Sequence, residues 1–491
     1  MGGEQGGARA PLCGRQELAA LTDDLAGRRV TLMGLGTFGG GVGAATFLAR
    51  RGARLTVTDL RTEAELRPSV EALRDLPVRY RLGGHRERDF ARADLVVASP
   101  AVPRANRFLR AAHEAGARLT SPMNIFLALC RAPIAAVTGS NGKSTTTALL
   151  AHMLKSAGHT VWLGGNIGIS LLPELDRIGP AHQVVLELSS FQLQDAGALR
   201  WSPPMAVVTN ITPNHLDRHG CFEEYAAAKR GILRHQRPGD YAVLNARDRT
   251  TGQWAREDLP ARPVGFDLPA EDPRPGTRLR DGRVQWADDE GVCELFAAAD
   301  LPLPGRHNLQ NAMAAAAAAR CMGAGAAEMV RALRNFGGLG HRLELVRTLD
   351  GVRYYNDSYS TTPESTVAAL RSFDAPTTLI AGGYDKMLDL SPIARAAAEA
   401  AEVVVTFGQT GPVLAGHCRR RGGESLVVRE APDLGQALRE AKQRARPGSV
   451  VVFSPGCASY DMFENCRRRG EEFCRLVWDK PGNDAGPGRC A

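Results

Sequence analysis

The chain has 491 residues, of which 44% are hydrophobic and 23% are charged. This balance excludes a globally disordered chain and a coiled-coil rod, and the length suggests about three domains of roughly 150 residues each. The 61 Lys and Arg residues outnumber the 53 Asp and Glu residues by eight. A nucleic-acid partner is one reason for a basic balance, and an enzyme with an acidic, phosphorylated substrate fits it equally well. Because the basic residues are scattered, we expect no nucleic-acid partner.

The cysteine pattern and the absence of long apolar runs bear on the cellular compartment. The ten cysteines are dispersed and none belongs to a C-x-x-C pair, which disfavours a zinc ribbon or a thioredoxin motif. No run of 18 apolar residues occurs, and residues 1–28 lack the apolar centre of a signal peptide. We therefore expect a cytoplasmic protein with reduced thiols and no membrane segment.

Three stretches alternate strand and helix patterns, which predicts an α/β fold with parallel sheets. The first stretch begins near residue 30, the second at the apolar run 134–138, and the third near Gly340. Residues 255–300 are rich in Pro, Asp and Arg, so we expect an irregular or antiparallel excursion there. The Ala-rich run 312–320 predicts a helix.

A first glycine turn follows the first expected strand. GLGTFG, residues 34–39, has the G-x-G-x-x-G spacing between a strand and a helix, and Asp59 lies 20 residues after its last glycine. Glycine lets the backbone approach a phosphate, the helix N-terminus favours negative charge, and a carboxylate at this distance can accept a bond from a ribose hydroxyl. The motif indicates a nucleotide but does not distinguish a dinucleotide from another kind.

A second glycine turn, TGSNGKST at residues 138–145, follows a buried strand and opens a helix. Its backbone amides can hold phosphates, Lys143 can neutralise the terminal ones, and Ser144 can ligate Mg²⁺. The loop is shorter than the usual G-x-x-x-x-G-K-[ST], because Val137 stands where the first glycine would be.

Together the two turns favour one class of protein over two others. A dinucleotide-dependent oxidoreductase needs only the first turn and leaves the second unexplained. A non-catalytic nucleotide-binding scaffold is the second alternative, and Lys143 in the second turn argues against it. A nucleotide-bearing substrate used with a separate triphosphate accounts for both turns.

At this second turn the sequence resembles the Mur ligase family of ATP-dependent amide-forming enzymes. The resemblance covers roughly residues 30–480, and SPGCAS at 454–459, together with the short first domain, is similar to the glutamate-adding type. The other matching stretches are TGSNGKST (138–145), GNIG (165–168), ELSSFQL (187–193), NITPNHLD (210–217), GRHNLQN (305–311), GHRLE (340–344), NDS (356–358) and GGYDK (382–386).

The resemblance implies a reaction and a division of labour among domains. The reaction adds D-glutamate to UDP-N-acetylmuramoyl-L-alanine in peptidoglycan synthesis, through an acyl phosphate made with ATP and Mg²⁺; a related type that adds L-glutamate is the alternative. We expect a monomer that acts on these small molecules. The expected parts are a flexible extension (1–28), a Rossmann-like domain for the UDP-substrate (29–125), a central P-loop ATPase-like domain for ATP (126–339) and a C-terminal Rossmann-like domain for the amino acid (340–491).

The resemblance also assigns roles to individual residues. Lys143, His215 and Lys229 are the expected catalytic residues, with Lys229 as a CO₂-derived carbamate. The expected ATP-binding residues are Gly139, Ser140, Asn141, Gly142, Lys143, Ser144, Thr145, Asn311, Arg342 and Asp357. The expected metal ligands are Ser144, Glu187, His215 and carbamoylated Lys229. The UDP-substrate would contact Gly34, Gly36, Thr37, Phe38, Asp59, Arg61 and Asn166, and glutamate would contact Lys386, Ser459 and Thr361.

Four positions depart from the family pattern. Tyr359 stands where the glutamate-adding type has a lysine, and Cys466 lies near the usual place of an aromatic residue. Thr37 and Phe38 replace the commoner Leu-Thr after GLG. We interpret His219 as a surface histidine; the competing interpretation of Lys229 is a surface lysine paired with an acidic neighbour or a phosphate.

Overall fold

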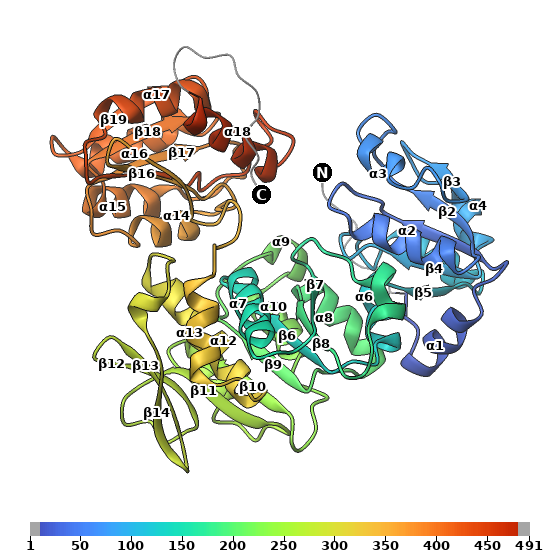
Figure 1. Ribbon diagram of the computed structural model, residues 1–491. Coiled ribbons are helices and arrows are strands. Elements are labelled where there is room, and N and C mark those ends of the chain that lie inside the picture. The colour runs from blue at the N-terminus through green and yellow to red at the C-terminus, as the bar shows by residue number, and fades with distance from the viewer. Residues whose placement is uncertain (1–9, 480–491) are drawn as a thin grey trace. The chain divides into compact units, whose positions relative to one another are not determined.

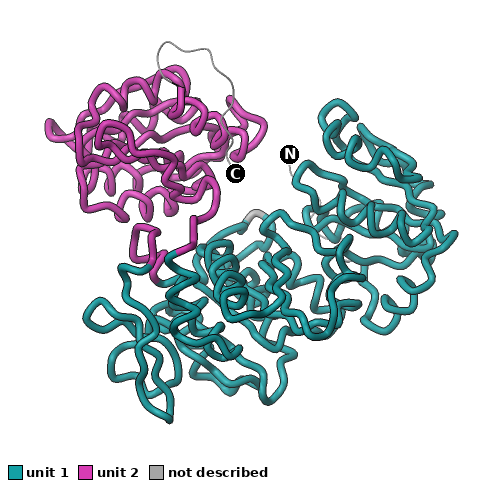
Figure 2. Tube along the Cα trace, viewed as in Figure 1, with its two compact units in different colours: residues 1–300, 310–334 teal, residues 301–309, 335–491 magenta. Residues whose placement is uncertain are grey.

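The computed structural model describes residues 10–479. The chain forms two compact units, one of residues 1–300 with 310–334 and the other of residues 301–309 with 335–491 (Figure 2). Three sheets lie within these units, two in the first and one in the second (Figure 1). The expected α/β fold is therefore confirmed.

The first sheet has five parallel strands in the order β3-β2-β1-β4-β5. Strand β1 is buried after its first residue, because its apolar side chains are covered on both faces. The strands are β1 (Arg29–Met33), β2 (Arg54–Thr58), β3 (Val78–Arg81), β4 (Leu95–Ala98) and β5 (Arg118–Thr120). The helices are α1 (Arg15–Asp23), α2 (Gly40–Arg50), α3 (Arg67–Glu71), α4 (Glu87–Ala91), α5 (Arg107–Glu114) and α6 (Pro122–Leu129).

The expected flexible extension at 1–28 is corrected for residues 10–28. Helix α1 lies in this stretch, and its Leu18, together with Leu25, is almost fully buried in the core that includes Leu48 and Ile125. Helix α1 packs on α6. The burial of apolar side chains therefore orders this segment, and residues 1–9 lie outside the described part of the chain.

The second sheet has nine strands in the order β14-β13-β12-β11-β10-β9-β6-β8-β7. Strands β6 to β12 pair in parallel, whereas β12, β13 and β14 form an antiparallel meander, which confirms the excursion expected at 255–300. The strands are β6 (Ile134–Thr138), β7 (Val161–Gly165), β8 (Gln183–Glu187), β9 (Met205–Val208), β10 (Tyr241–Asn245), β11 (Arg262–Leu268), β12 (Gly276–Arg280), β13 (Arg283–Asp288) and β14 (Gly291–Ala297).

Helices cover the parallel part of this sheet (Figure 1). Helix α7 packs on β6, β7, β8 and α13, and α8 packs on α6 and α10. The helices are α7 (Lys143–Ser156), α8 (Ser190–Ala196), α9 (Leu216–His219), α10 (Phe222–Arg230), α11 (Arg249–Trp254), α12 (Arg306–Cys321) and α13 (Ala326–Arg334), with short 3-10 turns at η1 (Leu172–Arg177), η2 (Gly197–Leu199) and η3 (Ala298–Asp300). Helix α12 contains the predicted Ala-rich helix.

The third sheet has six strands in the order β15-β16-β20-β17-β18-β19, and only β15 runs antiparallel to its neighbour. The strands are β15 (Glu344–Leu349), β16 (Val352–Asn356), β17 (Thr377–Gly382), β18 (Val403–Phe407), β19 (Val427–Ala431) and β20 (Val450–Phe453). The helices are α14 (Pro363–Leu370), α15 (Ser391–Ala400), α16 (Gly411–Gly422), α17 (Leu434–Arg444) and α18 (Cys466–Trp478).

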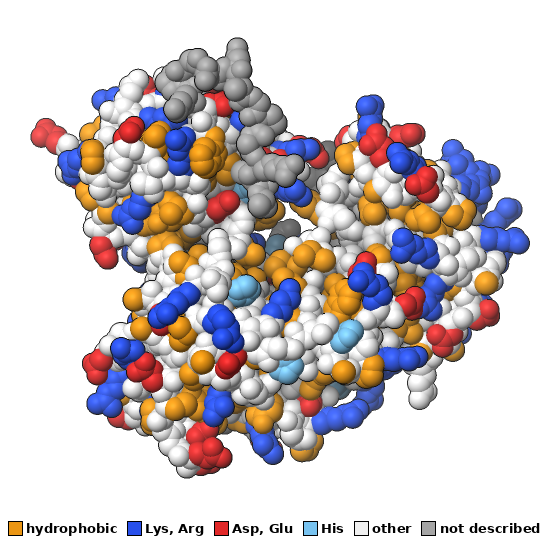
Figure 3. Space-filling view, viewed as in Figure 1, with side chains coloured by type: hydrophobic (Ala, Val, Ile, Leu, Met, Phe, Trp, Pro, Cys, Tyr) orange, Lys and Arg blue, Asp and Glu red, His pale blue; other side chains and the backbone are white. Residues whose placement is uncertain are grey.

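Lys and Arg side chains are interspersed with Asp and Glu on the face seen in Figure 3. Within residues 10–479, no helix is both long and apolar enough to cross a membrane.

Candidate active site

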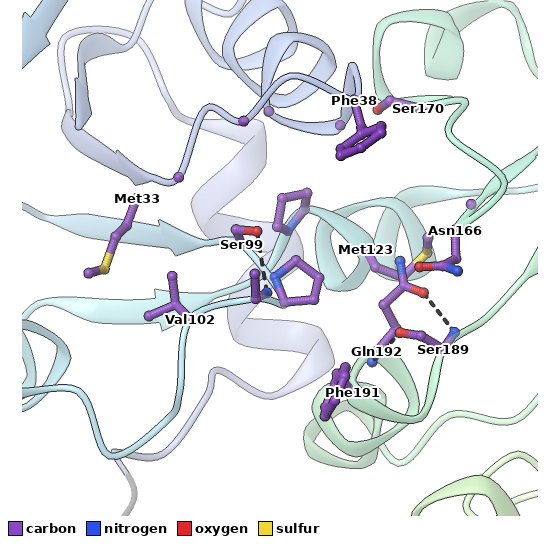
Figure 4. Close-up of a pocket in the computed structure, with 18 of the residues that line it drawn as sticks. Met33, Phe38, Ser99, Val102, Met123, Asn166, Ser170, Ser189, Phe191 and Gln192 are labelled. Atoms are coloured by element: carbon purple, nitrogen blue, oxygen red, sulfur yellow. Dashed lines mark hydrogen bonds between the residues drawn. The ribbon is translucent and has the colours of Figure 1, made fainter. Parts of the chain in front are cut away.

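A cavity of about 1080 Å³ joins the two glycine turns within the first unit. It opens where the parallel strands of the first and second sheets end, the usual place for a ligand in such sheets. From the first domain, its lining includes Gly34, Gly36, Thr37, Phe38, Asp59 and Arg61. From the central domain it includes Lys143, Asn166, His215 and Lys229. The close-up shows Phe38 and Asn166 among the lining side chains (Figure 4).

Asp59 organises the first glycine turn. One of its carboxylate oxygens accepts hydrogen bonds from the amides of Leu35 (2.9 Å) and Gly36 (3.0 Å), and the other accepts one from the amide of Arg61 (3.0 Å). Asp59 is buried. The carboxylate therefore fixes the first glycine turn and the backbone at Arg61 at this end of the cavity. Its bond to a ribose stays a prediction.

The side chains around this turn suit a nucleotide. The Phe38 ring is 58% exposed although it lines the cavity, so its face is open for stacking. The Arg61 guanidinium lies 3.5 Å from the Thr37 hydroxyl and adds a cation beside the turn. An aromatic ring and a guanidinium are suited to a base and a phosphate, respectively.

Neighbouring side chains pack around the second glycine turn. Gly142, the N-cap of α7, has a φ of 82°, and a side chain there would collide with the Asn311 amide. The backbone N–H of Asn141 donates to Asn210 Oδ1 (2.9 Å), and the Ser140 hydroxyl lies 2.9 Å from the Tyr225 hydroxyl. The side chain of Asn311, one of the predicted ATP-binding residues, lies beside this turn.

Ser144 and Glu187 meet behind this turn, at the start of α7 and the end of β8. The Ser144 hydroxyl donates to Glu187 Oε2 (2.5 Å), and the Asn166 amide donates to Glu187 Oε1 (2.7 Å). Glu187 is buried, 2% exposed. A buried carboxylate beside a hydroxyl is a hard-oxygen donor set that fits Mg²⁺.

Lys229 is buried against the phosphate-binding turn. It is 2% exposed, its Nζ donates to the Gly139 carbonyl (2.8 Å), and the same atom lies 4.9 Å from the Tyr225 ring centroid. Burial holds its pKa well below the usual lysine value, the positive charge of Lys143 lowers it further, and Glu187 opposes both. The interpretation of Lys229 as a surface lysine is therefore wrong.

His215 and His219 differ in their surroundings. His215 is the N-cap of α9 with a φ of 53°, a strained conformation of the kind that is common at functional sites. His219 is not a surface histidine as expected: it is 3% exposed, its Nε2 lies 2.9 Å from the Ser190 hydroxyl, and its ring stacks on Phe191. Its pKa is lowered, mainly by burial. The folding of α9 onto α8 and α10 explains this burial.

In the second unit, three loops at the carboxyl edge of the sheet gather the residues predicted for the amino acid. The Tyr384 amide donates to the Ala458 carbonyl (2.9 Å), which places the turn of Lys386 beside the loop of Ser459. The Gly456 amide donates to Ser360 (2.9 Å), which brings the loop of Thr361 to the same edge. Ser459 is buried, Thr361 is half-buried, Lys386 is exposed, and Lys386 Nζ lies 5.6 Å from the Tyr460 ring centroid.

Arg342 and Asp357, both predicted to bind ATP, also lie in the second unit. Asp357 accepts bonds from the Leu343 amide and from the hydroxyls of Ser360 and Ser454, and burial raises its pKa to about 6. The guanidinium carbon of Arg342 lies 5.1 Å from the ring centroid of Tyr359.

The two departures from the family pattern in this unit are neighbours. The ring of Tyr359 also stacks on His341, at 5.8 Å between centroids. Burial raises the pKa of Tyr359, and Cys466 at the start of α18 adds to the rise. Tyr359 and Cys466, which are distant in sequence, therefore act in one environment.

Three family comparisons match successive parts of the chain. They are "Mur ligase MurD-like, N-terminal domain" at residues 28–121, "Mur ligase middle domain" at 137–319 and "Mur ligase, glutamate ligase domain" at 341–457. A Roseiflexus protein described as "UDP-N-acetylmuramoylalanine--D-glutamate ligase" is 45% identical over 92% of this chain and 99% of its own length. The chain belongs to the Mur ligase family. A protein of the same description from Symbiobacterium thermophilum is 40% identical over 88% of this chain and 94% of its own.

Solved structures share the Mur ligase fold at lower identity. The UDP-N-acetylmuramate-alanine ligase of Thermotoga maritima has a TM-score of 0.59 and 20% identity, covering 92% of this chain and 99% of that one. A pseudomurein peptide ligase type C from Methanothermus fervidus has a TM-score of 0.57 and 18% identity, covering 92% and 100%. The MurF ligase of Thermotoga maritima, with a TM-score of 0.54 and 16% identity, was solved in complex with ADP and covers 93% and 95%.

Several residues of this Mur ligase site were missed by the sequence argument. Tyr225 precedes Lys229 by four residues, so both lie on the buried face of α10, and this spacing was a usable signal. Arg104, Asp195 and Arg218 bridge the first and central domains and carry no motif of their own. Only the folded chain brings these three together.

Proposed function

We propose that this Mur ligase joins D-glutamate to UDP-N-acetylmuramoyl-L-alanine with cleavage of ATP to ADP and phosphate. The observation that carries the proposal is the cavity, which runs from the nucleotide turn at Gly34 to Lys143 and Lys229. A substrate with a UDP group at one end and a carboxylate at the other suits such a cavity. The curated relatives of 40–45% identity carry this activity in their descriptions.

In the first step, a carboxylate oxygen of the UDP-substrate attacks the γ-phosphorus of ATP. The new O–P bond forms as the bond to the β,γ-bridging oxygen breaks, which gives an acyl phosphate and ADP. Both reactants are anionic, so neutralisation of charge is the main task. The flexible Lys143 side chain, whose Nζ now donates to the Ser140 carbonyl (2.8 Å), can turn toward the phosphates.

Ser144 and Glu187 would hold Mg²⁺ in this reaction. Bound there, the ion would supply positive charge to the phosphate oxygens. Asn166 holds the Glu187 carboxylate in place through its amide. We expect His215, which faces the same cavity, to be a ligand of a second ion.

Lys229 would supply an anion rather than a cation. Its lowered pKa favours the neutral amine, which can attack the carbon of CO₂. An N–C bond forms, one C–O π pair moves to oxygen, and the amine loses a proton to water, leaving a carbamate. Its oxygens would join the second metal site with His215.

In the second step, the neutral amine of glutamate attacks the acyl phosphate carbonyl. The new N–C bond forms, phosphate leaves with the electron pair of the C–O bond, and the nitrogen releases a proton to water. We propose that Lys386 pairs with a glutamate carboxylate, with Ser459 and Thr361 as hydrogen-bonding partners. Support comes from the three loops that meet at one sheet edge. Tyr359 in place of the family lysine removes one cation, so L-glutamate is the competing substrate.

The decisive experiment supplies UDP-N-acetylmuramoyl-L-alanine and ATP with D-glutamate or L-glutamate and identifies the product by mass and chirality. We expect turnover with D-glutamate and slower turnover with L-glutamate. Faster turnover with L-glutamate would reverse the stereochemical assignment. Turnover with lysine or diaminopimelate and none with glutamate would exclude this branch of the family.

We also propose that the enzyme acts as a monomer in the cytoplasm, where ATP and UDP-linked precursors are present. Light scattering of the purified protein with and without substrates tests this point, and a stable dimer would contradict it.

A further inference from the structure

The loop of residues 99–106, between β4 and α5, is tied to helix α8 of the central domain. It lines the cavity with Ser99, Pro100, Ala101, Val102, Pro103 and Asn106. Figure 4 shows Ser99 and Val102 of this loop with Phe191 of α8 among the lining side chains. The loop is therefore a wall of the proposed UDP-substrate site that two domains share.

The first tie is an ion pair between Arg104 and Asp195. The guanidinium donates to both carboxylate oxygens, with Nε 2.9 Å from Oδ1, and the side chains are 16% and 6% exposed. Burial raises the pKa of Asp195, and Arg104 opposes the rise. A guanidinium that donates to both oxygens of a largely buried carboxylate fixes the orientation of the two side chains as well as their distance.

The second tie runs through Arg218 of α9. Its guanidinium donates to the Ala101 carbonyl (3.1 Å), and its central carbon lies 4.8 Å from the Phe191 ring centroid. The same ring meets His215 edge-on at 5.5 Å between centroids. The loop is therefore connected through Arg218 and Phe191 to His215.

The spacing on α8 places both anchor points on one helical face. Phe191 and Asp195 are four residues apart, so their side chains are neighbours along the helix. Helix α8 begins three residues after Glu187, and the capping box of Ser189 and Gln192 fixes its start. A displacement of the loop would therefore act on a helix that starts at the proposed metal site.

We propose that Arg104, Asp195 and Arg218 form a two-point latch that positions loop 99–106 for the UDP-substrate and aligns that substrate with His215. The inference rests on the proposed function and adds positioning residues to it. An exposed pair offers the contrast. Arg51 and Asp176 also join the first domain to the central domain (2.8 Å), but Asp176 is 83% exposed and neither residue lines the cavity.

The test is a double-mutant cycle on the full chain with Arg104→Gln, Asp195→Asn and both together. We expect each single variant to raise the Kd for UDP-N-acetylmuramoyl-L-alanine, measured by calorimetry, by about tenfold. The Kd of the double variant should be no higher than the higher of the two single-variant values, because both substitutions remove the same interaction. The KM for ATP should stay within about twofold of wild type.

Arg218→Lys tests the second tie, because it keeps the charge and removes the planar group that lies on Phe191. We expect a higher KM for the UDP-substrate and a lower kcat, since both the loop and His215 lose support. Asp176→Asn is the matched control and should retain wild-type constants.

The outcomes separate the latch from the proposed function. A wild type that forms no product contradicts the function. If the wild type turns over, any of three results for the folded variants contradicts the latch. The variants keep the wild-type affinity for the UDP-substrate, or the effects of the Arg104 and Asp195 substitutions add, or the KM for ATP and the Kd for the UDP-substrate rise by the same factor. Equal losses in Asp176→Asn would also overturn it.

Discussion

The Nζ of Lys229 lies 2.8 Å from the carbonyl oxygen of Gly139, so a buried amine is held at the turn that receives the phosphates. The contact joins α10 to the end of β6. Lysine is rarely buried without a functional reason, because desolvation disfavours its charged form. The neighbouring Lys143 adds to this effect, and the site therefore favours the neutral amine.

We predict that Lys229→Arg is inactive although it keeps the positive charge. A guanidinium cannot add CO₂, so kcat should fall roughly 1,000-fold. Lys229→Ala should be equally impaired and should regain part of its activity when acetate or formate is added, because a free carboxylate can replace the carbamate. Phosphate release measures both effects. Near-normal turnover by Lys229→Arg would show that the lysine acts as an ordinary cation.

We predict that Lys143→Ala makes no acyl phosphate but still binds the UDP-substrate. The lysine would act on the γ-phosphate, whereas the UDP group would lie at the turn of Gly34 and Phe38. Calorimetry with UDP-N-acetylmuramoyl-L-alanine should give a Kd within about threefold of wild type, while ADP formation should fall at least about 100-fold. Parallel loss of UDP-substrate binding would contradict this division of labour.

We predict that Lys386→Gln weakens glutamate selectively. Removal of the cation should raise the KM for glutamate about tenfold and leave the KM for ATP unchanged, because one charge-assisted contact is lost. Lys155→Gln, an exposed lysine in the last turn of α7, is the control and should resemble wild type. An unchanged KM for glutamate in Lys386→Gln would remove Lys386 from the amino-acid site.

We predict a pH-dependent contribution of Asp357 to stability. Its folded pKa of about 6 lies above the ordinary value of 3.8 because the group is buried, so the folded state binds the proton more tightly. Its contribution is therefore greatest below pH 4, declines as pH rises from about 4 to about 6, and is constant above that. The loss is about 3 kcal/mol, from a shift of about two pKa units.

Asp357→Asn isolates this contribution, since an amide resembles the protonated acid and does not titrate. The melting temperature of the variant minus that of the wild type should increase as pH rises from 4 to 6. A difference that stays constant over this range would show that Asp357 titrates at its ordinary value.

The three α/β regions and the two glycine turns could be predicted from the amino-acid sequence, because they depend on local order along the chain. The apolar run of residues 134–138 is buried as a strand, and the turn at Gly142 needs a left-handed residue next to its own helix. The motifs also indicated Lys143, Ser144 and Glu187 as candidates, and the structure places the Ser144 hydroxyl in contact with Glu187.

The surroundings of the side chains between the motifs depend on how the whole chain folds. His219 is buried because α9 folds onto α8, and residues 10–28 are ordered because α1 packs on α6. Arg104 and Asp195 are 91 residues apart and form a pair because two domains meet at one loop. Burial, and with it the pKa of Lys229 or Asp357, depends on what the whole chain places around a group, and no local pattern contains that information.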